Sequence, residues 1–451
     1  MIRRAEPHHE VACPPDKSIT HRLLVLAGMA CGKSSILSPL VSGDTRATIR
    51  CLEKLGVRFD LQGDRLEVES PGVARWNRDP GILDCGNSGT TARLLIGVLS
   101  SVPGMKATIA GDESLSRRPM RRVLQALPAD AGVRIESPSG DTGADRLPLV
   151  IYGAKLSPFH ATSKVGSAQV KSALTLAGLG CDGETTITLP AGSRNHTEIL
   201  CVRLGLPVSA ERYGALETIT VRGPGEVQPF ALRVPGDPSS AMFLAAAGLL
   251  AGVRCMIPGI CANPLRTAAL DVLEQASIQI QRTPVRADDL SEPAENWIVP
   301  AWLDGSKPLT RSRAWGAEEI PAAWVPAIID EVPVLATILA FAQGPSMFRG
   351  LGELRVKESD RLAGIVRLLN AAGCAALAEG DDLIIPGGLK AKAIPDFSFD
   401  PEGDHRLAMC AMVLEQVAQK TCNISDRGCV EVSFPDFERV LLSIASKSGK
   451  K

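Results

Sequence analysis

The sequence repeats one pattern six times along its 451 residues. In each copy, a short polar or charged opening is followed by a run of small apolar residues with helical spacing. The openings begin at Lys17, Asn87, Ser167, Asp237, Asp330 and Asp404. A second helix is predicted to follow each first one, beginning near Asp44, Pro119, His196, Asn263, Lys357 and Phe434. The chain is therefore predicted to fold from six copies of one unit.

Short strands are predicted between these helices. Residues 106–110 and 184–189 contain β-branched side chains typical of strands, and residues 55–59 are expected to form a short strand after a glycine. The unit is then strand, helix, strand, helix, strand, and the fold class is α/β (α+β). Because the chain is too long for one ordinary core, two domains of three units each are the simplest packing. Their boundary is expected near residues 234–237.

Composition argues against several classes of protein. A net charge of −1 does not suit general nucleic-acid binding, and aromatic residues at 4% are too few for base stacking. The longest apolar runs, residues 241–253 and 332–342, fall short of the ~18 residues of a membrane span. The start lacks the apolar region of a signal peptide. Twelve cysteines without a C-x-x-C pair predict neither a zinc site nor disulfides, so we expect a cytoplasmic protein.

The polar openings carry cations as well as helix-capping residues. Ser, Thr, Asn and Asp are expected at N-caps, but Lys and Arg are unfavourable near the positive end of the helix dipole. Cations nevertheless lie at or next to the helix starts, at Lys17, Arg22, Arg93, Arg118, Arg194, Lys357, Arg361 and Arg406. An anionic ligand would explain them, because helix N-termini also bind anions. The sequence therefore predicts a polyanion site where several helix starts converge.

The most highly charged opening is Lys357-Glu358-Ser359-Asp360-Arg361. A helix is predicted to run through it, which would place Lys357 and Arg361 on one turn and Glu358 beside Arg361. The two cations would repel each other unless an anion lay between them. A solvated helix start is the alternative interpretation of such a charge run.

Eight motifs occur in a fixed order along the chain. They are residues 16–22 (DKSITHR), 84–93 (DCGNSGTTAR), 111–120 (GDESLSRRPM), 167–172 (SAQVKS), 193–198 (SRNHTE), 330–331 (DE), 354–361 (LRVKESDR) and 404–406 (DHR). This ordered set resembles the 5-enolpyruvylshikimate-3-phosphate (EPSP) synthase family.

The resemblance implies transfer of the enolpyruvyl group of phosphoenolpyruvate to the 5-hydroxyl of shikimate 3-phosphate, with release of phosphate. It implies no metal and no organic cofactor, and a place in the shikimate pathway of aromatic amino acid biosynthesis. The chain is expected to be a monomer. The implied fold has six βαβαββ repeats, three per domain, with the active site in the interdomain cleft. Residues 17–235 would form the N-terminal domain, mainly binding shikimate phosphate. Residues 1–16 and 236–451 would form the domain that carries the phosphoenolpyruvate and acid–base residues.

The resemblance also assigns ligands residue by residue. Those for shikimate 3-phosphate are Lys17, Ser18, Arg22, Ser167, Ala168, Gln169, Arg194, Asp330 and Lys357. Those for phosphoenolpyruvate are Lys17, Asn87, Gly89, Thr90, Arg118, Gln169, Arg361 and Arg406. Forked guanidinium groups suit the second set because they bind carboxylate and phosphate bidentately.

Three residues resemble the family's catalytic groups. Asp330 would orient and deprotonate the attacking hydroxyl, Glu358 would shuttle the methylene proton, and Lys357 would stabilise charge and assist the transfer. The resemblance also implies competition by glyphosate for the phosphoenolpyruvate pocket. Glyphosate-tolerant members carry alanine at the position of Gly89, so sensitivity is expected here.

Several features depart from the family's pattern. Pro15 replaces the usual glycine before the first motif, and Pro128 is predicted to end or kink the helix after Arg118. The family's alternative lysine is absent before Phe434. Residues 283–326, which contain Trp297, align with nothing and are interpreted as an insertion.

Three other functions are weighed against this one. A UDP-N-acetylglucosamine enolpyruvyl transferase would carry a cysteine in the loop at residues 112–120, which has none. A non-catalytic anion-binding protein would lack one of Asp330, Lys357 and Glu358, and all three are present. A nucleotide-binding phosphate loop at residues 28–34 has one residue too few between its glycines and ends a helix.

Overall fold

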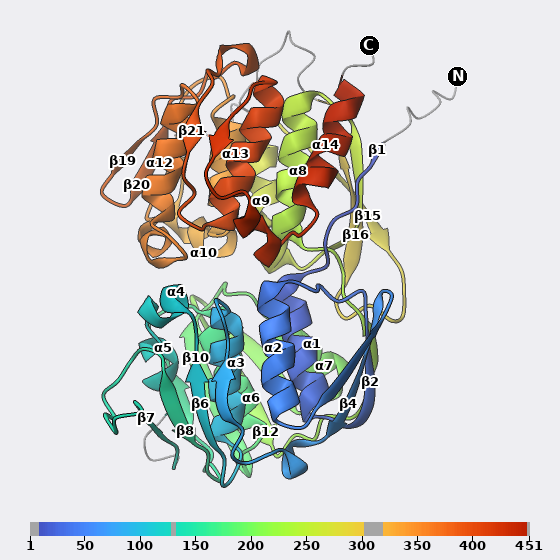
Figure 1. The fold of residues 1–451 in the computed structure, drawn as a ribbon, viewed down its shortest axis with the longest axis vertical. Coiled ribbons are helices and arrows are strands. Elements are labelled where there is room, and N and C mark those ends of the chain that lie inside the picture. Colours follow the sequence, from blue (N-terminus) through green and yellow to red (C-terminus); the bar gives the residue numbers. More distant parts are fainter. Residues whose placement is uncertain (1–8, 128–131, 302–318, 449–451) are drawn as a thin grey trace. The chain divides into compact units, whose positions relative to one another are not determined.

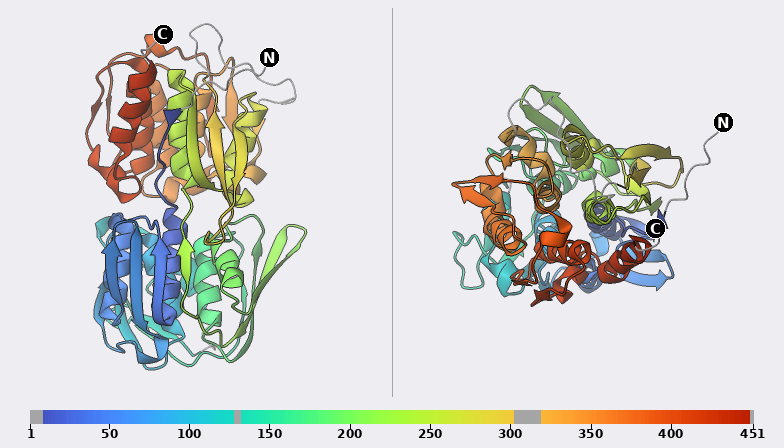
Figure 2. Two further views of the ribbon diagram at one scale, coloured as in Figure 1. Left: turned by 90° about the vertical axis from the view of Figure 1, so that its right-hand side faces the viewer. Right: turned by 90° about the horizontal axis from the view of Figure 1, so that it is seen from above.

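The computed structural model describes residues 9–127, 132–301 and 319–448, which form two compact units (Figures 1 and 2). Unit 2 comprises the described parts of Pro15–Val234 and Asp288–Glu292. Unit 1 comprises the described parts of Met1–Pro14, Pro235–Ala287 and Pro293–Lys451. Each unit has its own sheets and helices and is described separately.

Unit 2 contains three four-stranded sheets with the same internal pattern. In spatial order, the first sheet contains β13 (Ala231–Arg233), β2 (Cys31–Leu37), β4 (Arg65–Pro71) and β3 (Arg58–Gln62). The second contains β5 (Gly81–Asp84), β6 (Lys106–Ala110), β8 (Leu149–Tyr152) and β7 (Arg134–Glu136). The third contains β9 (His160–Thr162), β10 (Gly183–Pro190), β12 (Leu216–Gly223) and β11 (Val208–Tyr213). The first pair in each sheet is parallel and the other pairs are antiparallel. The helices between them are α1 (Lys17–Met29), α2 (Gly43–Lys54), α3 (Gly89–Ser100), α4 (Glu113–Arg117), α5 (Arg121–Leu124), α6 (Ala168–Gly178) and α7 (His196–Arg203).

Unit 1 repeats this pattern. Its two four-stranded sheets are β1 (His9–Glu10), β14 (Cys255–Cys261), β16 (Ala294–Val299) and β15 (Gln281–Val285), then β17 (Glu319–Ile320), β18 (Ser346–Phe348), β20 (Asp382–Ile385) and β19 (Leu377–Glu379). In the sixth repeat, the described residues form only the parallel pair β21 (Ser398–Phe399) and β22 (Asn423–Ile424). The helices are α8 (Pro238–Ala251), α9 (Pro264–Gln275), α10 (Val325–Ile328), α11 (Val332–Leu339), α12 (Arg361–Ala371), α13 (His405–Ala418) and α14 (Phe437–Ser448). The predicted six-fold repeat is confirmed, with a shortened last copy.

The opening strands of two repeats come from distant parts of the chain. In unit 1, β1 pairs in parallel with β14, so that His9 lies opposite Cys255. In unit 2, β13 pairs in parallel with β2, so that Ala231 lies opposite Ser35. In the other repeats, the opening strand directly precedes its own first helix. The N-terminal segment thus supplies the opening strand of the first sheet of unit 1. In unit 2, β13 comes last in the sequence, but it supplies the opening strand of the first sheet.

The first helices begin where the polar openings predicted them. Asp16, Ser88, Asp237 and Asp404 are N-caps whose side chains accept backbone hydrogen bonds from the first turn. The apolar bodies that follow are almost wholly buried, and α8 is buried from Pro238 to Leu250. A helix that is apolar on all sides belongs in a core. In Figure 1, α8 lies beside α13 and α14, its neighbours in unit 1.

The predicted insertion at residues 283–326 is wrong over its described parts. Residues 283–285 belong to β15, and β16 pairs antiparallel with both β14 and β15. Trp297 lies in β16 and is fully buried in the core of unit 1. Buried and half-buried residues alternate along β16 from Glu295 to Val299. Residues 302–318 and Pro128, where a helix kink was predicted, lie outside the described residues.

The segment Asp288–Glu292 corrects the expected division of the chain, which put residues 236–451 in one domain. The Arg233 N–H donates to the Asp289 carbonyl at 2.7 Å, and the Ser291 N–H donates to the Arg233 carbonyl at 2.9 Å. The Arg233 side chain also donates from Nε to Asp289 Oδ2 at 3.0 Å. These bonds attach the segment to the end of β13, and so to unit 2.

No single helix within residues 9–127, 132–301 and 319–448 is long and apolar enough to cross a membrane. One bent pair, Ala322–Ile328 with Val332–Leu339, meets the length and composition criteria only when its two helices are taken together.

His21 connects three helices in the interior of unit 2. Its Nδ1 lies 2.8 Å from Thr48 Oγ1 on α2, and Thr48 Oγ1 lies 2.6 Å from Thr91 Oγ1 on α3. Burial lowers the pKa of His21 to about 3; Asp44 opposes this shift, and Lys17 adds to it. The imidazole is therefore neutral in the folded protein at neutral pH.

We predict that His21 makes the fold less stable as the pH falls. Below the unfolded pKa of about 6.5, the unfolded chain binds a proton that the native protein does not bind until about pH 3. The free energy of unfolding should then fall by on the order of 1.4 kcal/mol per pH unit in this window from His21 alone. Urea unfolding of His21→Gln at several pH values should give a shallower slope. Parallel curves for the wild type and the variant would contradict the prediction.

Candidate active site

Arg22 organises the first predicted ligand cluster, in unit 2. Its Nε donates to Thr197 Oγ1 at 2.8 Å, and its terminal nitrogens donate to Ser172 Oγ at 2.7 Å and to the Ser18 carbonyl at 2.9 Å. Thr197 Oγ1 in turn donates to Ser172 Oγ at 2.7 Å. One buried side chain on α1 therefore connects α6 and α7, and all its hydrogen-bond acceptors are neutral oxygens.

The electrostatics of Arg22 favour a nearby anion. Burial lowers the pKa of its guanidinium, which means that the protein pays a desolvation cost to keep the charge there. The carboxylates of Glu198, Asp16 and Glu292 partly offset this, whereas the positive charge of Arg194 adds to the lowering. Arg194 lies half-buried before α7, close enough to act on Arg22. Two neighbouring cations with this burial are suited to a phosphate.

Gln169 lies at the centre of a second cluster in unit 2. Its amide nitrogen donates to Thr90 Oγ1 at 2.9 Å, and its amide oxygen accepts from Arg93 at 2.9 Å. The same Arg93 nitrogen donates to the Gly89 carbonyl at 3.2 Å. Gly89 is the first residue of α3, and a Cβ there would lie 2.6 Å from this nitrogen. Arg93 therefore connects the α3 N-terminus to the α6 N-terminus, and its guanidinium would have to shift if residue 89 carried a Cβ.

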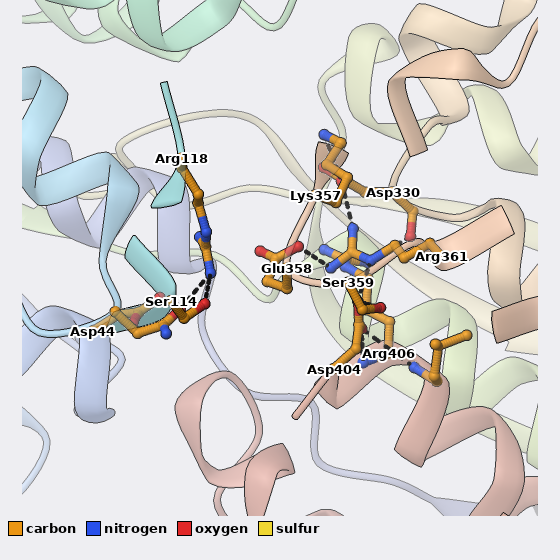
Figure 3. A network of polar contacts seen from close by, with 12 residues as sticks. Asp44, Ser114, Arg118, Asp330, Lys357, Glu358, Ser359, Arg361, Asp404 and Arg406 are labelled. Carbon is orange, nitrogen blue, oxygen red and sulfur yellow. Dashed lines mark hydrogen bonds and ion pairs between the residues drawn. The ribbon is translucent and has the colours of Figure 1, made fainter. Parts of the chain in front are cut away.

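Arg118 and Lys17 occupy the remaining predicted positions for phosphoenolpyruvate in unit 2. Arg118 donates to Asn87 Oδ1 at 2.6 Å and to Ser114 Oγ at 3.1 Å, as the close-up in Figure 3 shows for Ser114. Lys17 Nζ forms an ion pair with Asp44 Oδ2 at 3.0 Å. The sequence interpretation missed Asp44, which holds Lys17 at the start of α1.

The other unit 2 positions lie at helix starts. Ser18 is in the first turn of α1 and half-buried, and Ala168 is the first residue of α6. Ser167 is the N-cap of α6, but its side chain makes no capping hydrogen bond. Its hydroxyl is therefore not used to cap the helix, unlike the Ser88 hydroxyl at α3. The structure places these residues as predicted, on the N-terminal ends of α1 and α6.

In unit 1, the structure corrects the helix predicted through Lys357 and Glu358. A short 3₁₀ helix, Gly352–Val356, precedes them, and α12 begins only at Arg361. Asp360 is the N-cap, because its side chain accepts from Ala363 N at 3.0 Å. Lys357 and Glu358 therefore lie on an irregular segment before the helix, and capping by Asp360 overrides the helical spacing. The segment is partly buried, so a fully solvated helix start is also excluded.

Arg361 lies between three carboxylates in unit 1, as Figure 3 shows. Its Nε is 2.7 Å from Asp404 Oδ2, and its terminal nitrogens are 2.5 Å from Glu358 Oε2 and 3.4 Å from Asp330 Oδ1. The side chain is 1% exposed. Burial alone would lower the pKa of Arg361, but Asp404, Glu358 and Asp330 raise it above its ordinary value. Arg361 is therefore a permanent cation at the centre of this cluster.

Asp330 joins the two other cations of the cluster. Lys357 Nζ lies 3.5 Å from Asp330 Oδ1, the oxygen that also faces Arg361. Arg406 donates to the Asp330 carbonyl at 2.7 Å. The anion expected between Lys357 and Arg361 is thus partly supplied by the protein itself, as the Asp330 carboxylate. The five unit 1 residues predicted for the site, Asp330, Lys357, Glu358, Arg361 and Arg406, all lie in this one cluster.

Asp404 is the main residue that the sequence interpretation missed in unit 1. Its carboxylate is fully buried, and Oδ2 binds Arg361 and accepts from Ser359 Oγ at 3.2 Å. Its other oxygen caps α13 through the Arg406 N–H at 2.9 Å. One side chain thus fixes both predicted arginine ligands of unit 1. Its place directly before His405 and Arg406 was visible in the sequence, but a capping role alone would have explained it.

No group of three or more His, Cys, Asp or Glu side chains within the described ranges is arranged to hold a metal ion. None of the twelve cysteines, all of which lie in the described ranges, forms a disulfide.

Comparison with known proteins agrees with this fold. A family model described as EPSP synthase (3-phosphoshikimate 1-carboxyvinyltransferase) matches residues 5–441. The 3-phosphoshikimate 1-carboxyvinyltransferase of Gloeobacter violaceus is 39% identical over 432 residues, covering 95% of this chain and 94% of that protein. The enzyme of the same name from Roseiflexus sp. is 36% identical and covers 99% of this chain and 100% of its own length.

Solved structures give the same result. EPSP synthase from Acinetobacter baumannii superposes with a TM-score of 0.80 at 28% identity, covering 98% of this chain and 97% of that one. The enolpyruvyl transferase NikO from Streptomyces tendae has a TM-score of 0.68 at 17% identity, which shows a common fold. The fold is therefore that of the enolpyruvyl transferases. The chain belongs to the EPSP synthase family, and it is a transferase of the shikimate pathway.

Proposed function

We propose that the chain transfers the enolpyruvyl group of phosphoenolpyruvate to the 5-hydroxyl of shikimate 3-phosphate, using residues of both units. Membership of the family supports the reaction. In unit 2, shikimate 3-phosphate is bound by Arg22, Ser18, Lys17, Arg194, Ser167, Ala168 and Gln169. Phosphoenolpyruvate is bound by Arg361 and Arg406 from unit 1 and by Arg118, Lys17, Asn87, Gly89, Thr90 and Gln169 from unit 2.

The observation that carries the proposal is the cluster around Arg361. A lysine, two half-buried carboxylates and a buried arginine lie within hydrogen-bonding or ion-pairing distance of one another. A reaction that moves a proton off a hydroxyl and onto a methylene carbon needs such acid and base groups held close together. Burial of the cation strengthens its hold on a carboxylate or phosphate, because few waters compete.

The chemistry follows in two steps. Asp330 orients the 5-hydroxyl and takes its proton as the oxygen attacks C2 of phosphoenolpyruvate, while Glu358, protonated once it has left Arg361, delivers its proton to C3. Elimination then reverses the second transfer: Glu358 takes a proton back from C3, the C2–O bond to phosphate breaks, and phosphate leaves with the proton that Asp330 took from the hydroxyl, together with the enol ether. Lys357 stabilises the charge that develops between these groups.

Arg361 also accounts for how Glu358 becomes available. The 2.5 Å contact between Arg361 and Glu358 occupies the guanidinium edge that a substrate carboxylate would use. A bound carboxylate at that edge would take over this contact and release Glu358 towards the methylene carbon. Asp404 would keep Nε of Arg361 in place throughout.

The direct test measures phosphate release from phosphoenolpyruvate with and without shikimate 3-phosphate. Release that depends on shikimate 3-phosphate is expected. Parallel reactions with UDP-N-acetylglucosamine test the second enolpyruvyl transfer, and release with that acceptor alone would overturn the proposal. Binding of both substrates without release would favour the non-catalytic alternative.

We further propose that the chain acts as a monomer in the cytoplasm. Light scattering during gel filtration at micromolar concentration, with and without both substrates, should give the mass of one chain.

Gly89→Ala is predicted to weaken inhibition by glyphosate more than it raises the KM for phosphoenolpyruvate. The added methyl would lie 2.6 Å from an Arg93 nitrogen and would push the guanidinium away from Gln169. A methyl in a packed site costs on the order of 1–3 kcal/mol, which corresponds to a ~5- to 150-fold effect. Inhibition assays at low phosphoenolpyruvate measure both constants. Resistance of the wild type to millimolar glyphosate would contradict the assignment of this pocket.

A further inference from the structure

Glu292 is a buried carboxylate that neither the sequence interpretation nor the proposed reaction uses. It ends the segment Asp288–Glu292, which belongs to unit 2 although the residues on both sides of it belong to unit 1. Its Oε1 lies 2.6 Å from Nδ1 of His196, and both side chains are fully buried. A buried carboxylate is costly unless it is paired, so this contact fixes both partners.

The segment is held by its backbone as well. It lies in the connection between β15 and β16 and runs alongside the end of β13, where Leu290 forms a parallel bridge with Arg233. Arg203, the last residue of α7, donates to the Asp288 carbonyl. The two ends of the segment are thus bonded to the two ends of α7, through Arg203 and through His196.

His196 leads directly to the predicted phosphate ligands. It is the first residue of α7, and the next residue, Thr197, accepts the hydrogen bond from Nε of Arg22. The first turn of α7 is held by His196 and Thr197, and also by the buried Glu198, which forms an ion pair with Lys171 at 2.9 Å. The negative charge of Glu292 also helps Arg22 to keep its proton against the cost of burial.

We propose that Glu292 is a positioning residue for shikimate 3-phosphate: through His196 it fixes the start of α7, and thereby Thr197, which holds the phosphate ligand Arg22. This rests on the assignment of Arg22 under the proposed function. The effect should fall mainly on shikimate 3-phosphate, because the contacts described above join Gln169 to Thr90 and Arg93, and Arg118 to Asn87. Loss of the Glu292 carboxylate should therefore weaken the binding of shikimate 3-phosphate more than that of phosphoenolpyruvate.

The test compares Glu292→Gln with Glu295→Gln. Glu295 lies in the same hairpin, is also buried, and accepts from the Trp297 indole at 2.8 Å. Glu292→Gln should raise the Kd for shikimate 3-phosphate, measured by calorimetry, by about 10-fold or more, because a charged hydrogen-bond partner is lost. The KM for phosphoenolpyruvate and kcat should each change by less than about threefold. Glu295→Gln should lower Tm but leave the Kd within about twofold.

Several outcomes would overturn the inference. One is a Kd of Glu292→Gln for shikimate 3-phosphate within about twofold of the wild type. Another is an equal loss of affinity for both substrates. A third is a loss of affinity that follows the fall in Tm in both variants. If Glu292→Gln does not fold, Glu292→Asp, which withdraws the charge by one methylene, is judged by the same criteria. Wild-type protein that does not bind shikimate 3-phosphate would refute the proposed function as well. Normal wild-type binding with an unaffected variant would refute this inference alone.

Discussion

Glu358→Gln should reduce turnover by ~10³-fold or more while leaving the Kd for shikimate 3-phosphate within about threefold. Glutamine has nearly the same size and can still accept a hydrogen bond from Arg361, 2.5 Å away in the wild type. It cannot carry a proton to or from the methylene carbon. The ligands proposed for shikimate 3-phosphate in unit 2, such as Arg22, are side chains other than Glu358. Steady-state assays and calorimetry on the same preparation measure the two effects.

Glu353→Gln provides the matched control for this experiment. Glu353 lies in the 3₁₀ helix that precedes Lys357, and it is exposed. Its substitution removes the same charge from the same segment, and kcat should stay within about twofold of the wild type. If Glu358→Gln instead loses substrate binding but turns over normally once saturated, then Glu358 binds substrate and does not transfer the proton.

Asp404→Asn should lower kcat/KM for phosphoenolpyruvate by ~10²-fold and also lower the stability of unit 1. Asparagine can offer one oxygen, either to Arg361 Nε or to the capped Arg406 N–H, and its NH₂ group must then face the other donor. Leaving a buried cation without its partner commonly costs about 3–5 kcal/mol. Substrate kinetics together with thermal unfolding separate the loss of orientation from the loss of stability.

Asp400→Asn is the control for Asp404. Asp400 lies in the same loop and accepts from Glu402 N and Ser425 Oγ at 2.9 Å, but it is exposed. Its substitution should leave kcat/KM within about twofold. Asp404→Asn could instead keep the wild-type kcat/KM and lose only thermal stability. That result would show that Arg361 does not depend on Asp404 for its position.

The helix starts could be predicted from the sequence because each combines an N-cap side chain with an apolar body. Asp16 before α1 and Ser88 within the α3 opening are local signals, and the structure uses both as caps. Lys357 shows the limit of this reasoning. Its spacing from Arg361 suits a helix, but Asp360 is the residue that caps the helix, so α12 begins only at Arg361.

Long-range pairing could not be predicted in the same way. Nothing in the composition of β1 or β13 indicates a partner more than a hundred residues away, and the resemblance alone suggested where the N-terminus pairs. The same applies to Glu292, whose partner His196 is distant in sequence. Candidate ligands such as Arg22 could be named from their place at helix starts. Residues that only hold those ligands, such as Thr197 and Asp404, look like ordinary caps and helix residues until the contacts are known.

The exchange of opening strands affects how the chain can fold during synthesis. The β1 strand leaves the ribosome first, but its partner β14 begins only at Cys255. The first sheet of unit 2 likewise waits for Ala231–Arg233 before β2 gains its parallel neighbour. Closing loops of this length costs little more free energy than closing shorter ones, but such distant contacts form slowly. Each unit should therefore pass through a nascent state with one unpaired strand edge, and that edge is where a chaperone or a second nascent chain would bind.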